Sequence, residues 1–307
     1  MKLIKPYFNI IEQQAGLEGI YKHIEMAGRT CYKSEDKITE DSAKEFVDRM
    51  IKSGHGAMLE HGTVYLKWQQ TYHWDGMYGD DCIYDGNPLD KYKSNKYSKF
   101  TKFASMTKTN NKDNSTYYIT TNLRVLVENN WLNDLQYISE PTEYHEKRHT
   151  VKFICDRGVS HEFVRHRVFS FAQESTRYCN YSKDKFSNEI TFITPPWFDK
   201  ELHFNSGALD IVDGFSELKE QFGLDGAVFL SNLLNAEDDY KTLINEEWKP
   251  QQARAILPNS LKTELVMTGF VSDWKHFFEL RCPGSAHPQA RELAIPLNEE
   301  FINRKYI

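Results

Sequence analysis

The sequence lacks the features that mark several large classes of protein. Its five cysteines are widely spaced over 307 residues and include no Cys-x-x-Cys pair, which argues against a disulfide framework and a zinc ribbon. It contains no Gly-x-Ser-x-Gly, no Walker loop and no Gly-x-Gly-x-x-Gly, so neither a hydrolase nucleophile elbow nor a P-loop or Rossmann site is indicated. Few, unpaired cysteines favour reduced thiols and a cytoplasmic protein.

Long apolar runs and an excess of positive charge are also missing. No run approaches the ~20 residues of a membrane-spanning helix, and the N-terminus shows no cleavable signal. The net charge of −6 does not favour nucleic acid or an anionic membrane as partners, and we expect neither. Any anion site must therefore be a local concentration of positive charge. With 40% hydrophobic residues, the chain has enough apolar side chains for a large core.

Hydrophobic periodicity predicts a mixture of strands and helices. A turn is predicted at 156–158, and Asn122 and Asp273 are plausible helix caps. Strands are predicted at 3–11, 64–66, 117–120, 150–155, 188–194 and 263–270, and helices at 17–28, 39–53, 123–135, 211–240, 250–258 and 274–281.

Residues 68–116 differ in composition from the rest of the chain. The first part, 75–90, is acidic and rich in glycine, whereas 91–112 carries seven lysines among Ser, Thr, Asn and aromatic residues. This segment is either an insertion with its own small structure or a mobile surface loop. Lysines interleaved with aromatic rings also occur in proteins that bind single-stranded nucleic acid, although solvated lysines are the simpler interpretation.

Positive charge is concentrated in residues 165–178. This stretch holds three arginines, one histidine and four hydroxyl side chains, with Glu174 as its one carboxylate. Guanidinium groups match phosphate and carboxylate oxygens two at a time. The composition predicts a pocket for a small phosphorylated or anionic ligand; the alternative is a solvated basic helix face.

Other residues narrow the chemistry. His161 and His166 are five apart, so they do not share a helix face as the histidines of a zinc protease do, and no metal site is predicted. Arg254 and Arg281 lie among apolar residues, where a charge is costly unless it has a partner. Arginines that converge on one cavity would hold a phosphate and stabilise a deprotonated ring nitrogen.

Residues 165–178 resemble the RHRxxSxNExSxRY signature of flavin-dependent thymidylate synthases, with Ala172 in place of Asn and Gln173 in place of Glu. Three further segments are similar to motifs of that family and follow in the same order. Residues 54–61 resemble its GHxxxxEH loop, 253–258 its ARxxLP helix, and 276–281 its C-terminal segment that ends in a catalytic arginine.

The resemblance implies a single α/β domain over residues 1–307, with a mixed sheet, several long helices and an insertion at about 68–116. It implies a homotetramer with active sites shared between subunits. The implied reaction is the reductive methylation of dUMP to dTMP, with methylenetetrahydrofolate as carbon donor and NADPH, through FAD, as hydride source. The competing interpretation is a non-catalytic module that binds nucleotide phosphates.

The family's functional positions can be carried over residue by residue. Arg281 takes the position of the catalytic arginine, and Glu162 falls where some members have a dUMP-binding Gln. Ala57 falls where the family has a hydroxyl that can contact flavin, so the resemblance implies a contact through the Ala57 backbone only. The positions implied around dUMP are Glu162, Arg165, Gln173, Ser175, Arg177, Arg254 and Arg281; those implied around FAD are His55, Ala57, Arg165, His166, Arg167, Gln173 and His276.

Overall fold

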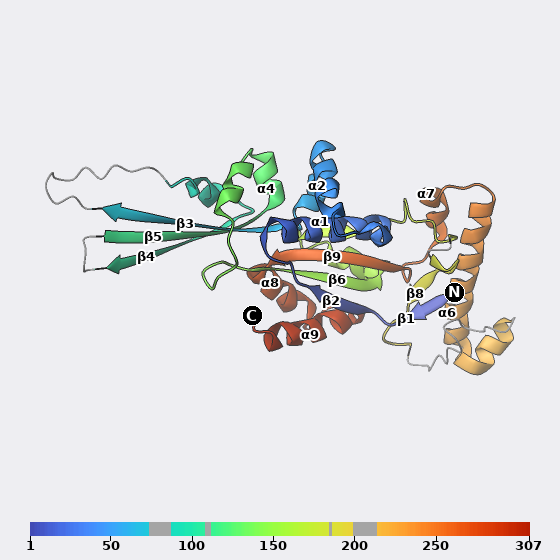
Figure 1. The fold of residues 1–307 in the computed structure, drawn as a ribbon. Coiled ribbons are helices and arrows are strands. Elements are labelled where there is room, and N and C mark those ends of the chain that lie inside the picture. Colours follow the sequence, from blue (N-terminus) through green and yellow to red (C-terminus); the bar gives the residue numbers. More distant parts are fainter. Residues whose placement is uncertain (74–86, 108–111, 184–185, 199–213) are drawn as a thin grey trace.

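A computed structural model describes residues 1–73, 87–107, 112–183, 186–198 and 214–307. It confirms the α/β class, with helices packed against sheets (Figure 1). The described strands fall into a four-stranded, a three-stranded and a two-stranded sheet. No helix in these ranges is long and apolar enough to cross a membrane.

The four-stranded sheet lies at the centre of the molecule. Its order is β2-β6-β9-β7, and every neighbouring pair is antiparallel. Nearly every residue of the two middle strands is buried, because helices cover both faces of this sheet. The strands are β2 (Tyr7–Ile11), β6 (Arg148–Asp156), β9 (Lys262–Phe270) and β7 (Ser170–Gln173).

Helices cover both faces of this sheet (Figure 1). Leu265 and Met267 of β9 face a core that includes Trp274 and Phe277, whereas Val266 packs against Ala27 on the other face. This alternation follows from the two-residue period of a strand. The first face carries α5 (Arg157–Phe163), α8 (Val271–Arg281) and α9 (Pro288–Asn303); the second carries α1 (Gly16–Tyr32), with α2 (Ser42–Lys52) and α3 (Gly56–Leu59) beside it.

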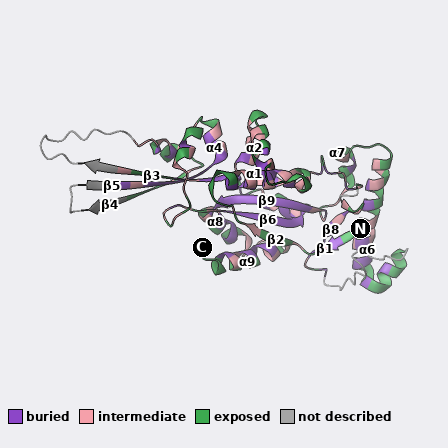
Figure 2. Ribbon diagram, viewed as in Figure 1, coloured by how far each residue is buried: buried purple, intermediate pink, exposed green. Residues whose placement is uncertain are grey.

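The three-stranded sheet extends away from the body (Figure 1). Its order is β3-β5-β4, and its buried residues gather where it meets α4 (Leu123–Glu128), which the Asn122 side chain caps (Figure 2). The described residues of the 68–116 segment therefore have a structure of their own, one of the two alternatives. The strands are β3 (Thr63–His73), β4 (Lys99–Thr107) and β5 (Lys112–Asn122).

At the opposite end, the chain's N-terminus pairs in parallel with a strand from its middle. The Met1 amino group lies 2.8 Å from a Glu237 carboxylate oxygen, which anchors this end. Leu3, Phe192 and Leu230 belong to the core here. The elements are β1 (Lys2–Ile4), β8 (Thr191–Ile193), α6 (Phe215–Asn245), α7 (Pro250–Ala253) and a 3-10 turn at Arg254–Ile256.

Several predicted boundaries differ from the structure for local reasons. The strand predicted at 3–11 is two strands interrupted at Pro6, which has no N–H to donate. The helix predicted to end near Gly28 continues to Tyr32. Gly28 lies against the Phe46 ring, where an added Cβ would come within 2.4 Å of a ring carbon, so this glycine serves close packing.

The C-terminal half holds two further differences. The turn predicted at 156–158 is the first turn of α5, where an Asp156 carboxylate oxygen accepts from the Val159 N–H at 2.8 Å. No helix is predicted beyond Arg281, yet α9 follows and packs on α5 and α8. Pro296 interrupts the helical pattern of α9.

Gly269 provides a test of the packing beneath the signature loop, residues 164–169 between α5 and β7. A Cβ at this position would lie 2.5 Å from two ring carbons of Phe169. Gly269→Ala should therefore destabilise the protein by about 1–3 kcal/mol, because the Phe169 ring is buried in the core and cannot easily move aside. Gly284→Ala is the matched control: its Cβ meets nothing within 4 Å, and its effect should stay within about 0.5 kcal/mol. Equal unfolding midpoints for the two variants would contradict this packing.

Candidate active site

Arg281 lies at the centre of a compact group of polar side chains. It is the last residue of α8, where the helix dipole favours a cation. Its Nη1 donates to Glu162 Oε2 at 2.7 Å, its Nη2 to the Glu162 carbonyl at 2.7 Å, and its Nε to His166 Nε2 at 3.0 Å. Three acceptors thus fix the plane of the guanidinium.

His166 is neutral in this arrangement. Burial, reinforced by the charges of Arg281 and His276, lowers the pKa of His166 to about 4. Because its Nε2 accepts from Arg281, the single proton of the neutral ring is on Nδ1. The imidazole of His166 orients the Arg281 guanidinium without adding charge. In the described part of the chain, Glu162 is the one carboxylate paired with Arg281.

A second group joins the signature to the helical turn at 250–256. Arg254 Nη1 donates to Thr176 Oγ1 at 3.2 Å, and Arg177 Nε donates to Gln251 Oε1 at 3.1 Å. Ser175 Oγ accepts from the Arg177 N–H at 3.3 Å. Across the described ranges, neither guanidinium has a carboxylate within 4.0 Å. Their charge is available to an anionic ligand.

Gln173 and Glu174 end β7 and point to different partners. Gln173 Nε2 donates to Ser160 Oγ at 2.9 Å and to Thr263 Oγ1 at 3.2 Å, which ties it to α5 and β9. The buried carboxylate of Glu174 accepts from Lys262 Nζ at 2.8 Å and from the Tyr181 hydroxyl at 3.1 Å. This ion pair holds the strand end from which Ser175 and Arg177 follow.

The positions implied for FAD are mostly on the surface. Arg165, Arg167 and His276 are exposed, and the rings of His276 and His166 are 6.4 Å apart. His55 and Ala57 are exposed beside α3, and no hydrogen bond or ion pair among the described residues links them to the arginines. The structure therefore groups Glu162, His166 and Arg281, groups Ser175, Arg177 and Arg254, and leaves His55 and Ala57 apart from both.

Sequence reasoning missed Arg148, the first residue of β6. Its Nη1 donates to the Glu60 carbonyl at 3.0 Å and to Thr63 Oγ1 at 3.2 Å, and its Nη2 to Ser170 Oγ at 3.1 Å. Burial lowers its pKa to about 10. An arginine two residues before the strand predicted at 150–155 was the available signal.

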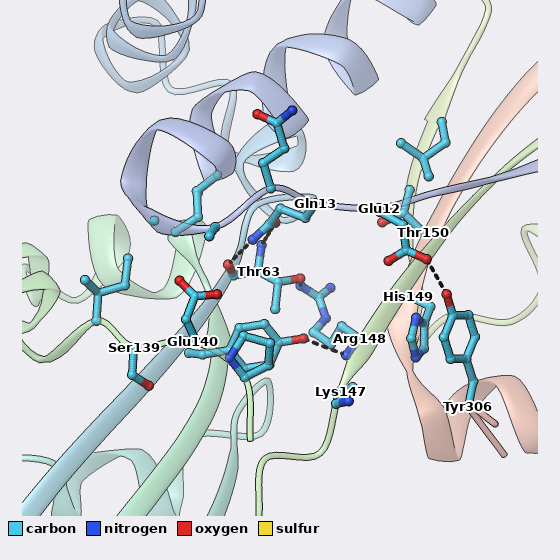
Figure 3. A pocket seen from close by; sticks show the side chains of 18 residues that line it. Glu12, Gln13, Thr63, Ser139, Glu140, Lys147, Arg148, His149, Thr150 and Tyr306 are labelled. Carbon is cyan, nitrogen blue, oxygen red and sulfur yellow. Dashed lines mark hydrogen bonds between the residues drawn. The ribbon is translucent and has the colours of Figure 1, made fainter. Parts of the chain in front are cut away.

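Two cavities meet at Arg148. Figure 3 shows it on the wall of a cavity of about 200 Å³, with Thr63 and His149 beside it. A larger cavity of about 520 Å³ lies between the base of the three-stranded sheet and the signature loop, and it is lined by Arg148, Arg167 and Val168 among others. A volume of this size is typical of small-molecule sites.

Acid should destabilise the protein through its buried histidines. Burial lowers the pKa of His23 and His166 to about 4, whereas an unfolded histidine titrates near 6.5. The unfolded chain therefore binds more protons than the native one between those values, and the free energy of unfolding should fall as pH drops from about 6.5 to 4. Urea unfolding at several pH values between about 6.5 and 4 measures this free energy of unfolding.

His23→Gln should weaken that acid sensitivity, because Gln does not titrate and can still reach Thr150 Oγ1, the present partner of His23 at 2.8 Å. His161→Gln replaces an exposed histidine and is the control. If both variants lose stability with acid as steeply as the parent protein does, His23 is not one of the groups responsible.

Comparisons with known proteins found similar sequences and a similar structure. Flavin-dependent thymidylate synthases of Corynebacterium diphtheriae and Pyrococcus furiosus are 32% and 31% identical to this chain over 143 and 150 residues. The aligned segments cover 45% and 49% of this chain and about half of those relatives, 50% and 52%. A crystal structure of the UMP/dUMP methylase PolB from Streptomyces cacaoi with 5-Br dUMP superimposes with a TM-score of 0.41 and 15% identity, covering 99% of this chain and 93% of PolB.

A family model described as thymidylate synthase complementing protein matches residues 148–304, from the first residue of β6 to the end of α9. That range contains the signature, both arginine groups and the whole of the β6–β9 pair. Because the match covers more than half of the sequence, the chain belongs to the thymidylate synthase complementing protein family.

Proposed function

We propose that this chain is a flavin-dependent thymidylate synthase. It would convert dUMP to dTMP, taking one carbon from methylenetetrahydrofolate and a hydride from NADPH through FAD. The observation that carries the proposal is the fixed Arg281 guanidinium at the end of α8, beside Glu162 of α5 and His166 of the signature. The curated relatives named above carry this activity in their names.

Arg177 and Arg254 would hold the phosphate of dUMP. Both guanidiniums lack a carboxylate partner among the described residues, and the hydroxyls of Ser175 and Thr176 lie beside them. Charge-assisted hydrogen bonds from arginine forks and hydroxyls are the usual means of binding such a group. The buried Lys262–Glu174 pair would keep this binding loop in position.

Arg281 would act on the base. A guanidinium stays charged at any working pH, so it stabilises negative charge that develops on the uracil ring at N3. Because three acceptors already orient it, little reorganisation is needed during the reaction. Gln173, which is hydrogen-bonded to α5, and Arg165 would complete the nucleotide site.

The residues around the signature loop fit a dinucleotide cofactor. Arg165 and Arg167 are exposed cations, and Val168 is 65% exposed, an apolar surface suited to a ring. His55, Ala57, His166, Gln173 and His276 are the further positions proposed for FAD. The flavin, when bound, supplies the hydride that completes the methyl group.

The open position of these residues supports a homotetramer with shared active sites. His55, Arg165 and His276 all face solvent on a single chain, so neighbouring subunits would have to enclose the cofactor.

Cys31, Cys155 and Cys282 are free thiols, which supports a cytoplasmic location as part of the same proposal.

Purified protein should bind FAD and form dTMP from dUMP when NADPH and methylenetetrahydrofolate are supplied. Arg281→Ala should keep its flavin and its reduction by NADPH, yet form dTMP at least about a hundredfold more slowly, because one preorganised charge is lost. Lys275→Ala, an exposed cation on the same helix, is the control. Protein that binds dUMP but neither binds flavin nor turns over would favour the non-catalytic module instead.

Glu162→Gln tests the carboxylate that faces Arg281. The substitution keeps an acceptor oxygen near Nη1 but removes the negative charge 2.7 Å away. The uncompensated guanidinium should stabilise an ionised base more strongly, so the acidic limb of the kcat–pH profile should move to lower pH. An unchanged profile in an active variant would show that Glu162 does not set the charge felt by the base.

A further inference from the structure

The cavity of about 520 Å³ carries more positive than negative charge. Five cations line it, Lys96, Lys99, Arg124, Arg148 and Arg167, against three carboxylates. This is a local reversal in a chain whose net charge is −6. A concave surface with such an excess attracts anions.

The three carboxylates of this cavity already have partners. Glu60 and Glu128 both accept from Arg124, at 2.5 and 2.6 Å. Asp273 accepts from the Phe270 N–H at 2.9 Å and so caps α8 from within. The charges of Glu60 and Asp273 also act on Arg148, but five cations against three carboxylates still leave the cavity with an excess of positive charge.

Three of those cations have no carboxylate within 4.0 Å in the ranges that the structure describes, namely Lys96, Arg148 and Arg167. Of these three cations, Arg148 is the least well satisfied by the described residues. Its guanidinium donates only to neutral acceptors, and its Nε lacks a hydrogen-bond partner. A cation withdrawn from water without a counter-ion is costly. An anion bound in the cavity would remove that cost.

Lys99 adds a second positive charge close to Arg148. Its Nζ lies 5.3 Å from the centre of the Phe270 ring, and the Arg148 guanidinium lies 5.4 Å from the same ring. The carboxylate of Glu146, which is half-buried, lies 3.6 Å from Lys99 Nζ. Two cations therefore share one aromatic ring at the cavity wall, an arrangement that a doubly charged ligand would stabilise.

The cavity also offers surfaces for a ring. Tyr97 is 55% exposed and Val168 is 65% exposed, and both line it. The Lys96 ammonium lies 4.8 Å from the Tyr97 ring centre. An exposed tyrosine and an exposed valine beside unpaired cations suit a ligand that combines phosphates with a planar base.

We propose that Lys96, Tyr97 and Lys99, with Arg148, form a binding site for the pyrophosphate and adenosine portion of a dinucleotide. These residues lie outside every family motif in the sequence. Lys96, Tyr97 and Lys99 come from the 68–116 segment, at and just before the start of β4. The inference rests on the proposed function, which supplies two such ligands, FAD and NADPH. The segment would thus contribute to cofactor binding from within the same chain.

The test compares the double variant Lys96→Ala/Lys99→Ala with the parent protein. Loss of two charge-assisted contacts should weaken dinucleotide binding about tenfold or more. FAD affinity is measured by flavin fluorescence, and the KM for NADPH is measured at saturating FAD. Lys102→Ala is the control, since Lys102 is an exposed lysine three residues along β4 and therefore on its opposite face.

A tenfold loss of FAD affinity would assign the cavity to FAD, and a tenfold rise in the KM for NADPH alone would assign it to NADPH. Tyr97→Phe should behave as the parent, whereas Tyr97→Ala should bind the same dinucleotide more weakly. Parent-like values of both constants in the double variant, with dTMP still formed, would overturn the cavity assignment and leave the proposed function standing. Parent protein that binds neither dinucleotide would overturn both.

Discussion

The antiparallel ladder between β6 and β9 is the constraint on which the site depends. It pairs Arg148 with Phe270 at one end and Asp156 with Lys262 at the other. The chain leaves β6 directly into α5 and leaves β9 directly into α8, so the two helices start from opposite ends of one ladder and run toward each other. Their far ends meet where Arg281 contacts Glu162 and His166. Register in the sheet thus sets the geometry of the guanidinium.

The arginines described above are of two kinds, which differ in whether a carboxylate compensates their charge. Arg281 and Arg124 are held by carboxylates, which fixes their direction at the expense of net charge. Arg148, Arg177 and Arg254 are held by neutral oxygens, which fixes them while their charge remains uncompensated. A fixed and compensated cation can respond to charge that develops during a reaction, whereas an uncompensated one favours a ligand that arrives already charged.

Sequence alone predicted the elements whose signals are local. The buried strands at 150–155 and 263–270 and the Asn122 cap were confirmed because apolar alternation and a capping side chain act within a few residues. Arg148 was missed because its importance depends on Glu60, Thr63 and Ser170, which only tertiary structure brings to it. The motifs named the arginines around the site, but the division of these arginines between two groups required the register of the sheet. The roles proposed for these residues and the limits of the insertion stay predictions.

Gln173 and Glu162, two residues proposed for the dUMP site, differ from the residues that the family resemblance implies, and both involve α5. Where the family has Glu in the signature, this chain has Gln173; where some members have Gln, it has Glu162. The amide of Gln173 donates to Ser160 of α5, the same short helix that carries Glu162. Glu162 therefore places its negative charge beside Arg281, whereas the amide of Gln173 is neutral. Under the proposed function, the uracil base would meet a neutral amide at Gln173 and a compensated cation at Arg281, and this difference in charge would decide how strongly each contact stabilises an ionised ring.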